Sequence, residues 1–241
     1  MDLKEVSERL NYYIRPQSFP LAIKLLASTE EVPERARIPS HDLGYAITTC
    51  QGVAMARRYG WVVVLGKEDV SCAPGAVGLG FVRREELRPP EGVVLPPPSR
   101  TLEYGKYRYL VIAPIHSATF EPDALVIYGN SAQMMRLAQS FSLGGQEVNA
   151  IARGGGDCID TATAKDDATA RLILPGGGDR VFGTTQDFEM IFALPWGKVE
   201  GTMKGLETTH QRGFRYPILS YVRGKAELPP FLDMKKMMEQ T

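Results

Sequence analysis

Cysteine and histidine are scarce in this sequence, and long apolar runs are missing. The 241 residues include three cysteines and three histidines. An odd number of cysteines argues against the disulfide framework of a small secreted protein. Apolar runs such as Trp61–Leu65 are far too short to span a bilayer, and the opening Met1–Glu5 has neither region of a signal peptide. We therefore expect a cytoplasmic protein that does not associate with membranes.

An excess of charge of either sign is also lacking, because 28 basic side chains balance 28 acidic ones. Nucleic-acid binding requires a clustered basic footprint, and the sequence contains no long run of lysine or arginine. We therefore expect no nucleic-acid partner. The apolar fraction of 44% is sufficient for a globular core.

The apolar periodicity predicts an α/β fold in which a mixed sheet is flanked by helices. No shift in composition marks a linker, so residues 1–241 are expected to form a single domain. The stretch 83–100 carries five prolines without a core pattern, which predicts an irregular loop and a candidate mobile segment. A short docking helix is expected near the methionines of the C-terminal tail. Helices are predicted over 2–14, 51–58, 131–141 and from Pro195 onward, and strands over 20–27, 61–65, 106–115, 123–128 and 188–194.

The three cysteines share one local context, in which each follows a loop and stands where a helix could begin. Cys50 follows two threonines, Cys72 precedes Ala-Pro-Gly, and Cys158 follows Gly-Gly-Gly-Asp. The first turn of a helix favours a thiolate over a thiol, because its unpaired N–H groups carry partial positive charge. This shared setting suggests that the three side chains meet at one site. Their alternative role is that of buried structural thiols, which is common for free cysteine.

If the three cysteines meet, thiolate ligands select an iron–sulfur cluster, Zn²⁺ or Cu(I). The spacing of Cys50, Cys72 and Cys158 matches no local zinc or ferredoxin motif, so the sequence leaves these choices open. A [4Fe–4S] cluster held by three cysteines leaves one iron open as a Lewis acid. His116 or His210 could instead supply a fourth ligand.

Carboxylates beside the cysteines are candidates for acid–base chemistry. Asp69, Asp157 and His116 are the predicted catalytic residues, with Glu68 and Asp160 nearby in sequence. A carboxylate close to another negative group has a raised pKa and can hold a proton. Helix capping by Asp69 and Asp157 would leave the same trace in the sequence.

A Gly-Gly-Gly-Asp tetrapeptide occurs twice, at 154–157 and again at 176–179. Such turns could form concave nests of backbone N–H groups that bind an anion. They could equally be tight flexible turns, and no phosphate-loop or dinucleotide-binding motif accompanies them.

Three stretches together resemble an uncharacterised prokaryotic family, the domain of unknown function 169. They are Thr49-Cys-Gln-Gly-Val-Ala-Met-Ala-Arg57, the segment from Glu68 to Gly80 that contains Asp-Val-Ser-Cys-Ala-Pro-Gly, and Phe120-Glu-Pro-Asp-Ala-Leu-Val-Ile127. The resemblance covers most of the chain and touches Cys50, Cys72 and Cys158. It implies no settled activity. The family is common in anaerobes, which suits iron–sulfur chemistry. Some relatives carry a further cysteine in the region of 180–183, and this chain has none there.

From these observations we expect an iron–sulfur protein with Cys50, Cys72 and Cys158 as ligands. The open iron would bind a small anionic or sulfur-bearing ligand, in the manner of a lyase or desulfurase. The alternative is a non-catalytic module that binds a small ligand and whose cysteines are structural. In either case the chain could form a homo-oligomer or bind a partner enzyme. A third possibility is thiol catalysis by Cys72 with a histidine base.

Overall fold

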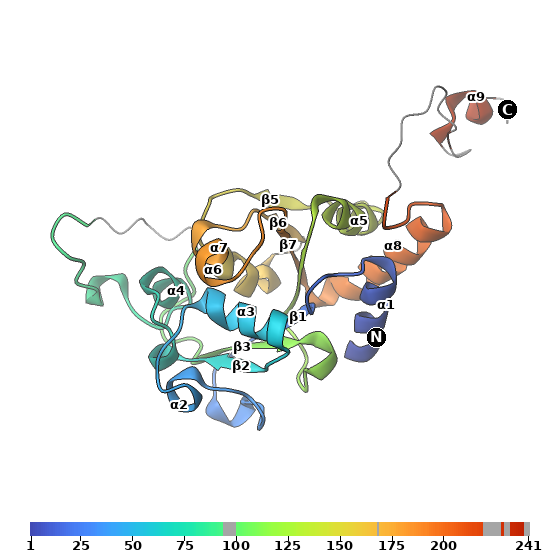
Figure 1. Cartoon of the computed structure of the whole chain (residues 1–241). Helices are drawn as coiled ribbons and strands as arrows, with labels where there is room; N and C mark the ends of the chain where they lie inside the picture. Colours follow the sequence, from blue (N-terminus) through green and yellow to red (C-terminus); the bar gives the residue numbers. More distant parts are fainter. Residues whose placement is uncertain (94–99, 168, 219–227, 229–231, 239–241) are drawn as a thin grey trace.

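The computed structural model describes residues 1–93, 100–167, 169–218, 228 and 232–238. Its centre is a single sheet of seven strands with helices on both faces (Figure 1). The strand order is β2-β3-β1-β4-β7-β6-β5, and the sheet is antiparallel except for the parallel pair β5–β6. The expected α/β class with a mixed sheet is confirmed. The strands are β1 (Leu21–Leu26), β2 (Val63–Leu65), β3 (Tyr109–Pro114), β4 (Ala124–Gly129), β5 (Asn149–Ile151), β6 (Arg171–Ile173) and β7 (Met190–Pro195).

One face of the sheet is covered by three long amphipathic helices, α1 (Leu3–Tyr13), α5 (Ser131–Ser142) and α8 (Val199–Gln211). Their apolar stripes bury aliphatic side chains against β4 and β7, with Leu137 and Phe192 fully buried. We call this side the long-helix face. Its core is mostly apolar, as the hydrophobic effect favours, although Arg136 of α5 is also fully buried there and donates to Thr209 of α8 at 3.0 Å.

The opposite face carries α3 (Thr49–Tyr59) and three helices of six residues each, α4 (Ala73–Gly78), α6 (Asp157–Ala162) and α7 (Gly177–Phe182). We call this side the short-helix face, and Figure 1 shows α4, α6 and α7 near α3. Side chains alternate across the central strand β4, so Val126 and Tyr128 point to the short-helix face while Ile127 points to the other. This alternation brings Tyr128 under the short helices.

Short elements complete the chain. They are α2 (Pro39–Asp42), α9 (Met234–Met238) and the one-turn 3₁₀ helices η1 (Thr29–Glu31), η2 (Lys67–Asp69), η3 (Arg84–Glu86), η4 (Ile115–Ser117), η5 (Ala164–Asp166) and η6 (Trp196–Lys198). Within the described ranges, no helix combines the length and apolarity that a bilayer span requires.

The predicted elements appear with shifted ends. The helix predicted over 131–141 is capped by Asn130, whose side chain accepts a hydrogen bond from the backbone of Gln133. The helix expected from Pro195 begins later, because Pro195 ends β7 and η6 intervenes. The tail helix forms as α9, but Met234 is 72% exposed, so the helix buries little of its apolar side. Of the loop 83–100, part forms η3, and 94–99 lies outside the described residues.

Candidate metal centre

All three cysteines lie at helix starts, as their sequence context indicates. Cys50 is the second residue of α3, Cys72 is the residue that caps α4, and Cys158 is the second residue of α6. The start of α3 is fixed by a capping box, in which Thr48 and Gln51 exchange hydrogen bonds of 2.8 and 3.1 Å. The position of Cys50 is therefore set by local sequence.

The two Gly-Gly-Gly-Asp segments pack against each other through their backbones. The N–H of Gly177 donates to the carbonyl of Gly154 at 3.2 Å, and the N–H of Gly176 donates to the carboxylate of Asp157 at 3.2 Å. A Cβ on Gly176 would lie only 2.6 Å from the Gly154 carbonyl oxygen, so this approach requires glycine. The recurrence of the tetrapeptide therefore brings Asp157 and Asp179 to the same place.

The cysteines and these two aspartates form one group, which we call the cysteine–aspartate cluster: Cys50, Cys72, Cys158, Asp157 and Asp179. The ligand atoms of Cys50, Asp157 and Asp179 all lie within 4.8 Å of one another. Cys50 also interacts electrostatically with both Cys72 and Cys158. The structure thus brings together three soft sulfur atoms and two hard carboxylates.

Four of these groups, Asp157, Asp179, Cys72 and Cys158, have pKa values raised above their ordinary values, which disfavours their negatively charged forms. Burial, followed by the charge of Asp179, raises the pKa of Asp157 to about 6. Burial also raises the pKa of Asp179 and of Cys72, and a side-chain contact with Cys50 together with burial raises that of Cys158. No lysine or arginine of the described chain forms an ion pair with the cluster. Such a concentration of anionic groups favours a bound cation, whose charge would lower these pKa values.

A network of buried polar side chains holds the carboxylate of Asp179. The hydroxyls of Tyr128 and Thr185 donate to its Oδ2 at 3.1 and 2.7 Å. The guanidinium of Arg57 lies 4.1 Å from the centre of the Tyr128 ring and pairs with Glu189 at 2.9 Å. These contacts fix the carboxylate in one orientation, as the residues behind a metal ligand commonly do.

One buried hydroxyl beside the cysteines has no partner. Thr49 is 1% exposed, and its Oγ1 makes no hydrogen bond within the described residues. A Cβ placed on Gly75 would lie 2.9 Å from this oxygen and 3.7 Å from the sulfur of Cys72, so both atoms border the same glycine. Buried polar atoms are normally satisfied, so an unpaired hydroxyl next to Cys72 is consistent with a ligand bound there.

Other predicted site residues lie elsewhere. Asp69 caps η2, accepting hydrogen bonds from the backbone and hydroxyl of Ser40 and from the backbone of Gly66 at 2.6 to 2.9 Å. Asp160 is buried on α6, and its nearest ionic partner is Arg153 at 3.7 Å. Of the predicted catalytic residues, only Asp157 joins the cluster.

Neither candidate histidine stands at the cysteines. His116 lies on η4 and packs against Phe19, with ring centres 4.9 Å apart. His210 lies on the long-helix face against Tyr12 and Tyr13, with ring centres 5.4 and 5.1 Å away. The fourth ligand suggested from the histidines is therefore better sought at Asp157 and Asp179.

Sequence reasoning missed Asp179, Tyr128 and Arg57. The repeated tetrapeptide was the available signal for Asp179, since two identical loops that pack together bring their aspartates close to each other. Tyr128 and Arg57 carried no such signal, because their roles depend on how α3 crosses the sheet.

A sequence model of the family DUF169, described as "Uncharacterised ArCR, COG2043", matches residues 9–205. The match includes every member of the cysteine–aspartate cluster. Comparison with curated proteins and with solved structures finds no match.

Proposed function

The chain belongs to the uncharacterised family DUF169, and from its cysteine–aspartate cluster we propose that the protein is a cytoplasmic iron–sulfur protein. In this proposal Cys50, Cys72 and Cys158 are the cluster ligands. A [4Fe–4S] cluster so held keeps one iron without a cysteine.

The proposal is supported chiefly by the convergence of all three cysteines on one buried site. They come from three helices far apart in the sequence, and a bound cluster would offset the burial that disfavours the thiolate forms of Cys72 and Cys158. Three thiolates favour iron–sulfur clusters over harder cations such as Mg²⁺. The residues present therefore fit the group.

The two aspartates suit the side of the cluster that lacks a cysteine. Asp157 has a pKa of about 6 in the metal-free chain, and the bound cluster would lower that value, so that Asp157 would be placed to accept a proton near neutral pH. Asp179 is held in place by Tyr128 and Thr185. A small anionic or sulfur-bearing ligand would bind the open iron, which supplies Lewis acidity for lyase or desulfurase chemistry, while Asp157 would donate or accept the proton.

A second candidate is a mononuclear metal site, which is favoured by the spacing of three ligand atoms. The ligand atoms of Cys50, Asp157 and Asp179 lie within 4.8 Å of one another. Around one zinc ion, with bonds of about 2.0 to 2.3 Å, ligand atoms are separated by less than about 4.6 Å. These three residues could therefore close on a single Zn²⁺ or Fe²⁺ with little movement.

Anaerobic purification followed by metal, acid-labile sulfide and visible absorption analysis separates these candidates. The iron–sulfur proposal predicts a brown protein with about four irons and four sulfides per chain, or about three irons if the open one is lost. The variant Cys72→Ser should lose most of the iron and sulfide, while Asp187→Asn, at an exposed position outside the cluster, should retain both.

The other outcomes have distinct signatures. One metal ion without sulfide, retained in Cys72→Ser and lost in Asp179→Asn, would replace the iron–sulfur proposal with the mononuclear site. A colourless protein without metal, in which all three thiols react with an alkylating reagent, would contradict both. That result would favour a non-catalytic binding module with structural cysteines.

A further inference from the structure

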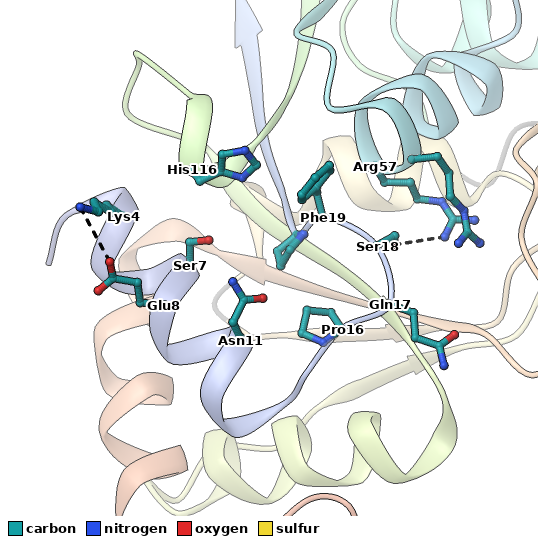
Figure 2. A pocket seen from close by; sticks show the side chains of 12 residues that line it. Lys4, Ser7, Glu8, Asn11, Pro16, Gln17, Ser18, Phe19, Arg57 and His116 are labelled. Carbon is teal, nitrogen blue, oxygen red and sulfur yellow. Dashed lines mark hydrogen bonds and ion pairs between the residues drawn. The ribbon is translucent and has the colours of Figure 1, made fainter.

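A cavity of ≈ 520 Å³ opens between α1, the segment that leads into β1 and the last turn of α3. Figure 2 shows Ser7 and Asn11 pointing from α1 toward Phe19, with Arg57 on the far side. The volume lies within the range of about 300–1,000 Å³ that small-molecule sites occupy. The cavity touches none of the five cluster residues, although Arg57 borders both the cavity and the Tyr128 ring that contacts Asp179.

The inner wall of this cavity carries one unbalanced positive charge. Arg57 and Arg58 both pair with the same carboxylate, Glu189, at 2.9 and 3.1 Å. Glu189 is 1% exposed, so these charges interact with little screening. At the mouth, Lys4 and Glu8 form an exposed pair at 3.9 Å and cancel. The cavity is therefore suited to an anion with a single charge.

Hydrogen-bond donors face this charge. Within the described chain, Nε and Nη1 of Arg58 have no hydrogen-bond partner, and neither do the side chains of Ser7 and Asn11. Ser7 is only 6% exposed, so its hydroxyl lies in the cavity wall. The hydroxyl of Ser18 accepts from Arg57 at 3.4 Å, which leaves its own proton for another acceptor. An incoming carboxylate would find a guanidinium edge and several neutral donors.

The remaining wall is apolar and partly flat. Phe19 is 41% exposed, and its ring packs on His116 with the centres 4.9 Å apart. Pro16 and Pro20 flank it. A planar apolar body could therefore stack on Phe19 while its charged end reaches Arg58.

We propose that this cavity binds a small aromatic monocarboxylate, with the carboxylate on the free edge of Arg58 and the ring against Phe19. A phosphate dianion fits less well, because Glu189 neutralises one of the two guanidiniums. The proposal stands without the metal centre.

Benzoate is the probe, measured by isothermal titration calorimetry on the full chain. Benzamide is the uncharged match, and inorganic phosphate is the polar anion without an apolar body. We expect benzoate to bind at least about tenfold more tightly than either of them. The variant Arg58→Gln should weaken benzoate binding about tenfold or more, whereas Arg35→Gln, at an exposed arginine outside the cavity, should leave it unchanged.

A second variant guards against an indirect effect of Arg58 on folding. Asn11 is exposed on α1, so Asn11→Trp should preserve the fold while its side chain fills the cavity and abolishes benzoate binding. Equal binding of benzoate and benzamide, stronger binding of phosphate, or unchanged benzoate affinity in Arg58→Gln would each overturn the proposal.

Discussion

The two faces of the sheet are built from helices of different length and different chemistry. On the long-helix face, α1, α5 and α8 have 11, 12 and 13 residues, and their core is mostly aliphatic and aromatic, although it also buries Arg136. On the short-helix face, α3 also has 11 residues, but α4, α6 and α7 have six residues each. The core beneath them includes buried charged side chains such as Arg57, Asp157 and Asp179.

Because of this difference, we expect the long-helix face to contribute mainly to stability and the short-helix face to carry the chemistry. A helix of six residues is not stable alone, because its few hydrogen bonds do not offset the unfavourable free energy of helix nucleation. The short helices are therefore held by loop contacts and by what binds among them, while the long helices are held by apolar burial. We expect mutations on the long-helix face to change the free energy of unfolding without changing metal content, and mutations on the short-helix face to change both.

The largest effect on stability is expected from Leu137→Ala. Leu137 is fully buried on α5 in the long-helix core. Removing its side chain should lower the free energy of unfolding by about 2–5 kcal/mol, from lost burial and the cavity left behind. Met135→Ala, at a position on the same helix that is 39% exposed, should cost far less. Urea unfolding measures both variants. A loss of metal per folded chain in Leu137→Ala would contradict the expectation that mutations on the long-helix face leave metal content unchanged.

The next effect is a pH dependence that belongs to the short-helix face. In the metal-free chain the pKa of Asp157 is about 6, raised by burial and by Asp179, against about 3.9 in an unfolded chain. Between these values the folded state binds more protons than the unfolded state. The contribution of Asp157 to stability is therefore fully present below about pH 4 and is lost as the pH rises from about 4 to 6, a change of at most about 3 kcal/mol.

Urea unfolding of the metal-free protein at a series of pH values measures this slope. Asp157→Asn should flatten it, because the amide does not titrate. The exposed Asp187→Asn is the control and should keep the slope. A slope that survives in Asp157→Asn would assign the titration to Asp179 or Asp160, whose pKa values burial also raises.

A pair of adjacent glycines tests how the short-helix face is assembled. A Cβ on Gly176 would lie 2.6 Å from the Gly154 carbonyl oxygen, whereas one on Gly177 would meet no atom within 4 Å. Gly176→Ala should therefore separate the two loops, lowering the free energy of unfolding by about 1–3 kcal/mol and reducing metal content. Gly177→Ala should leave both nearly unchanged. Similar metal content in the two variants would show that the loop contact does not position Asp157 and Asp179.

The long-helix face was the more predictable from sequence. The stripes of α1 and α5 repeat at helical spacing, and local periodicity is sufficient to place them. The elements between Gly145 and Asp187 were not assigned, because strands of three residues and helices of six leave too short a pattern. Their positions depend on contacts between distant segments, which sequence spacing does not report.

The candidate site was predictable to the extent that its members carry a local signal. The helix-start context of Cys50, Cys72 and Cys158 is visible in sequence, and the structure places each one at a helix start. Asp69 carried a similar context but caps η2 instead, since capping and ligation use the same residue type. Asp179 could be found only by asking why the tetrapeptide recurs.

The smallest change in the free energy of unfolding is expected from removing a helix cap, and each face has one capping box with which to test it. Thr48 with Gln51 starts α3, and Asn130 with Gln133 starts α5. Thr48→Ala and Asn130→Ala should each lower the free energy of unfolding by about 1 kcal/mol, with Asn130→Ala slightly costlier because Asn130 also donates to Tyr216. Only Thr48→Ala should weaken metal binding, by about tenfold, since Cys50 lies in the helix turn that it fixes. Metal affinity measured by competition with a chelator distinguishes them. Equal weakening in both variants would mean that the metal centre depends on the stability of the whole sheet and not on the local start of α3.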